Sequence, residues 1–194
     1  MKNSILDKMK CAIFDMDGTI LDSMPMWHTI ADTYLESIGK NPREDLWDNV
    51  KRLNMIETAR YFIDEYDVKK SIEEIGIEVK DLIMKFYGYT LQLKDGARDF
   101  LEELNRRKIP CVLATATERS CTIACMKRLG CDKYFKEIIT CLDLNTSKSS
   151  PLIFEESARR CGAKPEEAVV FEDALHALRT AHKAGFKTCR SEER

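Results

Sequence analysis

The sequence predicts an α/β protein in which helices cover both faces of a parallel sheet, with an all-helical segment inserted near its start. Short, almost continuously apolar runs recur along the chain, and amphipathic helical patterns separate them. Parallel strands that are buried on both faces produce such runs, because neither face meets water. The insertion is predicted by the stretch 22–91, which contains no convincing strand pattern.

Five apolar runs of strand length predict the sheet. They are Cys11–Phe14, Cys111–Ala114, Ile138–Cys141, Ala168–Phe171 and a weaker run at Phe186–Cys189. Between them, apolar residues recur at helical spacing. One such stripe follows a predicted capping residue, Asp95, and consists of Ala97, Phe100, Leu101 and Leu104; a later one consists of Ala174, Ala177, Leu178 and Ala181.

Three further helical stripes fill the inserted segment. The first begins with Trp27, shortly after Pro25, a residue that is tolerated at the start of a helix. The other two run over residues 55–66 and 72–86. The predicted domains are a sheet-containing core at 1–21 and 92–194 and a helical cap domain at 22–91.

Composition argues against several classes of function. The 194-residue chain carries 31 Lys and Arg against 33 Asp and Glu, so its net charge of -2 gives no electrostatic reason to expect binding to nucleic acid or an anionic membrane. No apolar run approaches the roughly 20 residues of a membrane-spanning helix. The eight Cys form no CxxC pair and the chain has three His, which indicates reduced thiols rather than disulfides or zinc. We expect a soluble, cytoplasmic monomer that binds neither nucleic acid nor membrane.

Polar residues follow the predicted strands at the point where each strand ends. In open parallel sheets, ligands bind beyond the carboxyl ends of the strands, so residues from distant parts of the chain meet there. The residues that follow strands in this way are Asp15, Asp17, Gly18, Thr19, Thr115, Thr117, Glu172 and Asp173, and Lys148 lies in the loop of residues 145–150 beyond the third strand. Their predicted convergence, rather than any one of them, indicates a site.

The acids of this set predict a divalent cation. Asp15 and Asp17 would repel each other at the end of an apolar strand unless a cation lay close by. An EF-hand calcium loop is disfavoured, because it needs an oxygen ligand at its fifth position, Gly at its sixth and Glu at its twelfth. Those positions hold Thr19, Ile20 and Met26. Carboxylates from Asp15, Asp17 and Asp173 suit Mg²⁺, which commonly bridges carboxylates and phosphate.

A phosphate ligand would explain the remaining polar residues. Lys148 supplies a compact positive charge for phosphoryl oxygens, and the Thr115 hydroxyl donates a hydrogen bond to another oxygen. Gly18 lets the backbone turn so that N–H groups face the anion. Taken singly, Thr115 could instead cap the following helix and Lys148 could lie on the surface. Together with the acids, they predict a phosphate group as the ligand.

The chain resembles the haloacid dehalogenase superfamily in the order of its motifs, which are Asp15-x-Asp17-Gly18-Thr19, Thr115, Lys148 and Glu172-Asp173. The helical segment before Thr115 is similar to the cap of the β-phosphoglucomutase-like and phosphoglycolate-phosphatase-like branch. The resemblance covers residues 10–190. It implies a Rossmann-like three-layer core with a parallel sheet, plus an inserted all-α helical cap domain.

The resemblance also implies a Mg²⁺-dependent phosphatase that hydrolyses a small phosphorylated metabolite through an aspartyl-phosphate. Asp15 would be the nucleophile, and Asp17 would be the general acid and then the base that activates water. The implied metal ligands are Asp15, Asp17 through its backbone carbonyl, Asp173 and, in or near the coordination sphere, Glu172. Thr115 and Lys148 would stabilise charge on the phosphoryl oxygens. Because a halide leaves without a proton, the presence of Asp17 favours phosphoryl transfer over dehalogenation.

Two alternatives remain open. A phosphomutase of the β-phosphoglucomutase type would have an Arg on a cap loop, where this chain has Met55, and often a His where it has Trp27. A catalytically silent binding protein would have no reason to retain both Asp15 and Asp17. A plain phosphatase is therefore favoured. The candidate substrate contacts are Met24, Trp27, His28, Asn54 and Met55 from the cap, and Thr117 and Glu118 beyond the second strand.

Overall fold

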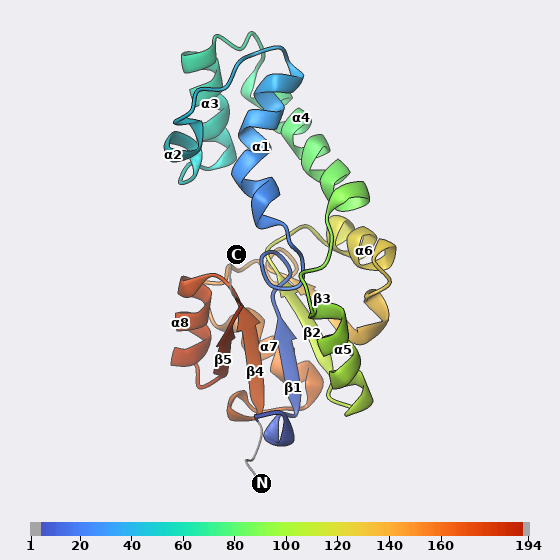
Figure 1. Cartoon of the computed structure of the whole chain (residues 1–194). Helices are drawn as coiled ribbons and strands as arrows, with labels where there is room; N and C mark the ends of the chain where they lie inside the picture. Colours follow the sequence, from blue (N-terminus) through green and yellow to red (C-terminus); the bar gives the residue numbers. More distant parts are fainter. Residues whose placement is uncertain (1–4, 192–194) are drawn as a thin grey trace. The chain divides into compact units, whose positions relative to one another are not determined.

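The structure is a computed structural model that describes residues 5–191. The chain forms two compact units (Figure 1). The first contains the described residues of Met1–Ser23 and Leu91–Arg194, and the second consists of Met24–Thr90. The chain therefore leaves the first unit after Ser23 and returns to it at Leu91.

Five parallel strands form the sheet of the first unit. In chain order they are β1 (Cys11–Phe14), β2 (Cys111–Thr115), β3 (Phe135–Thr140), β4 (Ala168–Glu172) and β5 (Lys187–Arg190). Their order across the sheet is β3-β2-β1-β4-β5. Phe14 is in register with Leu113 of β2 and with Phe171 of β4. The carboxyl ends of these three strands therefore lie side by side at the centre of the sheet.

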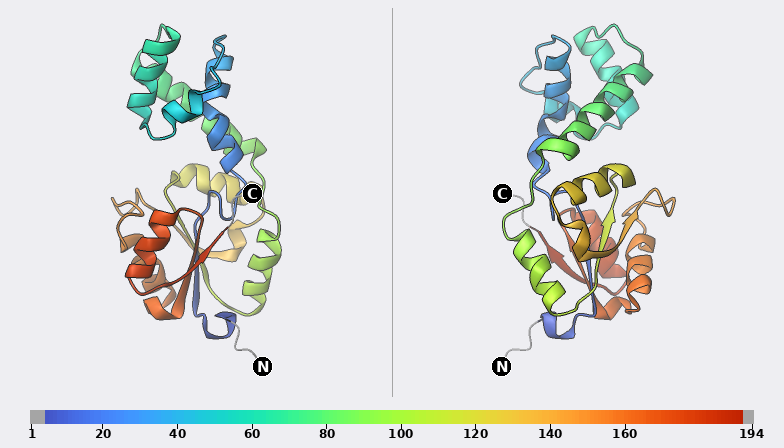
Figure 2. Two further views of the ribbon diagram at one scale, coloured as in Figure 1. Left: turned by 60° about the vertical axis from the view of Figure 1, so that its left-hand side comes forward. Right: turned by 90° about the vertical axis from the view of Figure 1, so that its right-hand side faces the viewer.

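Four helices cover the two faces of the sheet: α5 (Ala97–Arg106), α6 (Arg119–Arg128), α7 (Leu152–Cys161) and α8 (Leu175–Lys183). Short 3₁₀ helices precede β1, β3 and β4; they are η1 (Ile5–Lys8), η3 (Asp132–Tyr134) and η4 (Pro165–Glu167). Right-handed crossovers place α5 and α6 on one face and α7 and α8 on the other, because the chain reverses direction across the sheet after β3 (Figure 2). The predicted α/β fold with a parallel sheet is confirmed.

Alternate residues of β1 fill the cores on the two faces. Cys11 and Ile13 belong to a core that they share with Phe154 of α7. On the opposite face, Phe14 stacks on Phe171 with 4.6 Å between ring centroids. Successive strand residues point to opposite faces of a sheet, and here both faces are buried. This explains why the strand reads as a continuous apolar run.

The structure corrects the predicted start of β3 and the predicted cap of α5. β3 begins at Phe135 rather than at Ile138. It is an edge strand, and the charged Lys136 and Glu137 near its start interrupt the apolar run that marks the buried strands. Asp95 does not cap α5, because Gly96 occupies the N-cap position with φ of 77°, and no side chain bonds the cap. This left-handed conformation is one that glycine adopts without steric cost.

The second unit consists of helices: α1 (Met24–Ser37), α2 (Leu46–Val50), α3 (Met55–Tyr66) and α4 (Ile72–Lys85), with a π-helical turn, η2 (Phe86–Thr90), after α4. The three longer helices follow the predicted stripes, whereas the short α2 was not predicted. Tyr34 and Phe62 stack in the core of this helical unit, with 5.5 Å between ring centroids. Capping boxes begin α3 and α4, with Asn54 and Ser71 as the N-cap residues. Among residues 5–191, no helix combines the length and the apolar composition needed to cross a bilayer.

Candidate active site

The central strand ends bring four of the predicted residues together. Asp15 follows β1 directly, Glu172 is the last residue of β4, and Asp173 comes next. Lys148 lies in the loop between β3 and α7, and its side chain bonds both Asp15 and Glu172. Thr115 is the last residue of β2, the strand on the other side of β1. These residues are far apart in the sequence, and the parallel topology places them at one edge of the sheet.

Lys148 is the centre of a buried ion-pair network. Its Nζ donates to Oδ1 of Asp15 and, at 2.9 Å, to Oε1 of Glu172. The side chains of Lys148, Asp15 and Glu172 are 8%, 7% and 1% exposed. The other oxygen of Glu172 accepts hydrogen bonds from the backbone N–H groups of Asp173, at 2.7 Å, and Ala174, at 3.1 Å. Buried charges are costly unless they are paired, and this network pairs them. Lys148 is therefore a buried residue of the site and not a surface lysine.

Burial and neighbouring charges shift the pKa values of these groups. Burial raises the pKa of Asp15 well above its ordinary value; Lys148 opposes this shift, and Glu172 adds to it. Burial lowers the pKa of Lys148, but the two carboxylates outweigh it and hold that pKa above its ordinary value. Burial and the hydrogen bond with Glu172 raise the pKa of Asp173 to about 6. Asp15 and Asp173 therefore resist ionisation when no cation other than Lys148 is near, whereas the pKa of Glu172 is lowered, because its bonds to Lys148 and to the backbone outweigh burial.

The donor set of the site fits a hard divalent cation. One carboxylate oxygen from each of Asp15, Glu172 and Asp173 lies within 4.8 Å of the other two. These donors are all oxygens, which suits Mg²⁺ better than zinc or copper. A divalent ion would also offset the cost of ionising Asp15 and Asp173, whose pKa values are raised. The residues present thus fit the metal that the sequence predicts.

The loop after β1 folds back on itself through Gly18. This residue has φ of 73°, which requires the freedom of glycine, as the sequence predicts. Its N–H group donates to the carbonyl of Leu21, at 3.0 Å, and to the hydroxyl of Ser23, at 3.2 Å. Its carbonyl accepts from Nζ of Lys94 at 2.9 Å. The amide of Gly18 is therefore bonded within the loop, and its role in binding phosphate stays a prediction.

Thr115, at the end of β2, and Thr117, two residues later, have different partners. Thr115 is buried, and its Oγ1 accepts a hydrogen bond from the N–H group of Thr117 at 3.0 Å. A hydroxyl that accepts in this way can still donate its own hydrogen to a ligand. The sequence predicts Thr117 as a substrate contact, but its hydroxyl donates to Oδ2 of Asp17 at 2.6 Å. Glu118 is the N-cap residue of α6, so Thr115 is not the helix cap that its position also allowed.

Three of the predicted substrate contacts, Trp27, His28 and Met55, belong to the helical unit. Trp27 and Met55 line a cavity of about 300 Å³ within that unit. Trp47 lines it as well; no sequence signal marked this residue, because the short helix that carries it was not predicted. His28 is exposed, and its ring packs on Trp47 with 4.6 Å between centroids. The cavity is lined mainly by apolar side chains.

The other two predicted substrate contacts of the helical unit are Asn54 and Met24. The Oδ1 atom of Asn54 accepts from the N–H group of Glu57 at 3.0 Å, and Glu57 bonds back to the N–H group of Asn54 at 2.8 Å. This capping box engages Oδ1 of Asn54, and the role of this residue as a substrate contact stays a prediction. Met24 is the first residue of α1, where the chain enters the helical unit.

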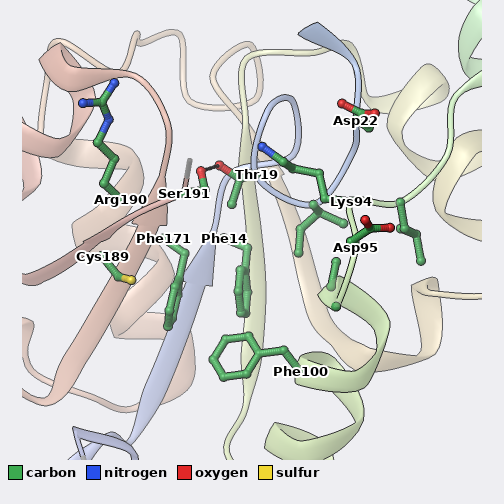
Figure 3. A pocket seen from close by; sticks show the side chains of 14 residues that line it. Phe14, Thr19, Asp22, Lys94, Asp95, Phe100, Phe171, Cys189, Arg190 and Ser191 are labelled. Atoms are coloured by element: carbon green, nitrogen blue, oxygen red, sulfur yellow. Dashed lines mark hydrogen bonds between the residues drawn. The ribbon is translucent and has the colours of Figure 1, made fainter. Parts of the chain in front are cut away.

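A second cavity, of about 450 Å³, lies on the α5 side of the sheet. Phe14, Phe100 and Phe171 form its aromatic floor, and the hydroxyls of Thr19 and Ser191 meet at 2.8 Å above it (Figure 3). Its lining does not include Asp15, Asp17, Lys148, Glu172 or Asp173. It adjoins the loop after β1 from the side and is separate from the candidate catalytic groups.

The arrangement combines the groups that a displacement at phosphorus needs. A buried carboxylate, Asp15, lies next to the ammonium group of Lys148 and two further acids. Cations at such a position can neutralise an anionic ligand and let a carboxylate approach it. Asp17, two residues further on, offers a second carboxyl group for proton exchange, and Thr117 holds one of its oxygens.

Known proteins share the sequence pattern and the fold of this chain. The sequence model described as "Haloacid dehalogenase-like hydrolase" matches residues 12–190. The chain is 28% identical over 179 residues to the "Phosphorylated carbohydrates phosphatase" of Thermotoga maritima, covering 92% of this chain and 83% of that protein. It is 27% identical over 202 residues to the "Probable pseudouridine-5'-phosphatase" of Drosophila melanogaster, covering 96% and 83%.

A solved structure shares both the fold and part of the sequence. It is described as "Crystal structure of putative beta-phosphoglucomutase from Thermotoga maritima" and superposes with a TM-score of 0.85 at 28% identity. The similarity covers 93% of this chain and 84% of that one. The range matched by the family model includes Asp15, Asp17, Thr115, Lys148, Glu172 and Asp173.

Proposed function

This chain belongs to the haloacid dehalogenase-like hydrolase family, and from that premise we propose that it is a Mg²⁺-dependent phosphatase of small phosphomonoesters. The observation that carries the proposal is the buried contact between Lys148 and Asp15, beside Glu172 and Asp173. Burying three charges costs stability, and a phosphate-binding catalytic site gives that cost a function. Relatives that are named as phosphatases support the same activity.

Asp15 is the proposed nucleophile. Its carboxylate attacks phosphorus, the bond to the leaving oxygen breaks, and an aspartyl-phosphate forms. Asp17 gives a proton to the leaving oxygen in this step and takes one from water in the next, when that water displaces Asp15. Lys148 and the hydroxyl of Thr115 bind the phosphoryl oxygens and stabilise the charge that grows on them.

Asp15, Glu172 and Asp173 are the proposed metal ligands, together with the backbone carbonyl of Asp17. When bound, Mg²⁺ supplies positive charge that polarises the phosphoryl group and neutralises its oxygens. Glu172 also has a second task, because it holds Lys148 at 2.9 Å and the backbone of Asp173 at 2.7 Å. It thereby fixes both a phosphate-binding cation and a neighbouring metal ligand.

The helical unit is proposed to be the cap that recognises the organic part of the substrate. Trp27, Trp47 and Met55 line a cavity of about 300 Å³ within it, which suits a group with apolar surface. Relatives act, by their names, on substrates as different as phosphorylated carbohydrates and pseudouridine 5'-phosphate. The proposal therefore extends to small phosphorylated metabolites as a class.

The substitution Asp15→Asn tests the proposed nucleophile. We expect it to lower kcat/KM for p-nitrophenyl phosphate in Mg²⁺ buffer by about 10³-fold or more, because an amide is a poor nucleophile. Circular dichroism should show the fold retained. The matched control is Asp99→Asn, the same chemical change at an exposed position in α5 of the same unit, and it should leave the rate unchanged.

Two outcomes would overturn the proposal. If Asp15→Asn keeps its rate within tenfold of the wild type, the nucleophile lies elsewhere. If the wild type hydrolyses no member of a broad panel of phosphomonoesters with Mg²⁺, the chain is not a phosphatase.

A further inference from the structure

Thr117 joins the two loops that carry the proposed catalytic groups. Its Oγ1 donates to Oδ2 of Asp17 at 2.6 Å, across 100 positions of sequence. Its backbone N–H group donates to Oγ1 of Thr115 at 3.0 Å. One residue thus contacts both a phosphate-binding candidate and the proposed acid and base.

The sheet creates this contact. Asp17 lies just beyond β1 and Thr117 lies just beyond β2, and these strands are neighbours in register. Thr117 is partly buried, and its β-branched side chain has few accessible rotamers. A rigid hydroxyl on a strand end can therefore fix the orientation of a carboxyl group on the neighbouring strand end.

The bond at Oδ2 distinguishes the two oxygens of Asp17. A carboxyl oxygen that accepts from a hydroxyl can keep that bond whether the group is ionised or protonated, provided that the proton is on the other oxygen. The contact with Thr117 thus gives Oδ2 the role of acceptor, so that a proton carried by this carboxyl group lies on Oδ1. It also limits rotation of the carboxyl group.

We propose that Thr117 is a positioning residue that holds Oδ2 of Asp17 and so presents Oδ1 to the leaving oxygen. The inference rests on the proposed phosphatase function. In the first step, the bond from phosphorus to the leaving oxygen breaks, its electron pair stays on that oxygen, and the proton of Oδ1 moves there while Asp15 bonds phosphorus. In the second step, Oδ1 takes a proton from the attacking water and the bond from Asp15 to phosphorus breaks.

Leaving groups of different basicity test this role. The leaving oxygen of p-nitrophenyl phosphate is stable as an anion and needs little protonation, whereas the alkoxide of glycerol 2-phosphate needs a proton. The measured quantity is kcat/KM with Mg²⁺, because it reports the step that forms the aspartyl-phosphate. Thr117→Val removes the hydroxyl and keeps the shape of the side chain, and Thr117→Ser keeps the hydroxyl.

We expect Thr117→Val to lower kcat/KM for glycerol 2-phosphate by about 30- to 100-fold and for p-nitrophenyl phosphate by less than about threefold, since a misplaced acid mainly affects the poor leaving group. Thr117→Ser should stay within about threefold of the wild type on both substrates. In an Asp17→Asn background, Thr117→Val should have no further effect on glycerol 2-phosphate, because the two residues act as one unit.

Equal losses on both substrates, or a full loss that persists in the Asp17→Asn background, would overturn the proposal and make Thr117 a phosphate contact or a purely structural residue. If Thr117→Val does not fold, Thr117→Ala carries the same comparison. Failure of the phosphatase proposal is distinguishable, because the wild type would then hydrolyse neither ester.

Discussion

The two units of this protein differ in what they bury. In residues 24–90, all of which the structure describes, every buried residue is aliphatic or aromatic. The α/β unit instead buries Asp15, Lys148 and Glu172 together at its central strand ends. Buried apolar groups stabilise a fold, whereas buried charges rarely do so by themselves. The contrast indicates that apolar burial stabilises the helical unit throughout. In the α/β unit, the buried charges of the candidate site lower the stability that burial alone would give.

Matched substitutions of one lysine in each unit test this difference, and they have the largest expected effect. Lys148→Met leaves Asp15 and Glu172 buried without their cation. We expect kcat/KM to fall by about 10²- to 10³-fold, because an electrostatic contact to the phosphoryl group is lost. In the absence of Mg²⁺, the free energy of unfolding should fall by about 3–5 kcal/mol, the cost of breaking a buried ion pair. Urea unfolding followed by circular dichroism measures it.

Lys70→Met is the control in the helical unit. Lys70 pairs with Glu78 at 2.5 Å, but the two side chains are 31% and 40% exposed. Water screens such a pair, so its removal should cost about 1 kcal/mol or less and leave the rate unchanged. Equal losses of stability for the two lysine variants would remove the contrast between the units.

Phenylalanines buried to the same degree provide the next test. Phe62 stacks on Tyr34 in the helical unit, and Phe154 lies in the core under the sheet; both are 1% exposed. Truncating either to Ala should cost about 3–5 kcal/mol through lost burial and a new cavity. If the two units are separately stabilised, Phe62→Ala should raise amide hydrogen exchange mainly within residues 24–90. Exchange that rises equally across both units would show that they unfold together.

The sequence was most informative where the sheet dictates position. A residue that ends a buried parallel strand must lie at the carboxyl edge, so Asp15, Thr115 and Glu172 could be placed without a structure. Lys148 lies in a loop, and its position followed only from the order of the motifs. The details of contact were not predictable, because they depend on side-chain rotamers. The bonds from Gly18 to Ser23 and from Lys94 to Gly18 are examples.

The helical unit was less predictable at the level of single residues. Its helices follow from apolar spacing, but their ends and loops decide which side chains are available to a ligand. Asn54 has the sequence of a capping residue, with Glu57 three positions later, and this signal favours the local role that the structure shows. Trp47 lies on the short helix α2, which is too brief to give a periodic pattern.

The smallest expected effect concerns Asp143, in the loop between β3 and α7 of the α/β unit. Asp143 accepts from Arg119 and from the N–H group of Thr140, and the hydrogen bond from Arg119 is the main reason that its pKa is lowered to about 2. An acid with a lowered pKa stabilises the fold above its ordinary pKa of about 4, and this stability is lost as the pH falls toward 2. Asp143→Asn should therefore cost about 1 kcal/mol or less at pH 7.

That cost should stay constant down to about pH 5 and begin to shrink by about pH 3, as urea unfolding at each pH would show. Asn54→Ala is the control from the helical unit, where the lost cap is an amide that does not titrate. It should cost about 1 kcal/mol, without the decrease at low pH that comes from titration of the replaced group itself. A difference between wild type and Asp143→Asn that stays flat from pH 7 to 3 would mean that Asp143 is not held ionised by Arg119. The polar contacts of the α/β unit would then resemble the caps of the helical unit.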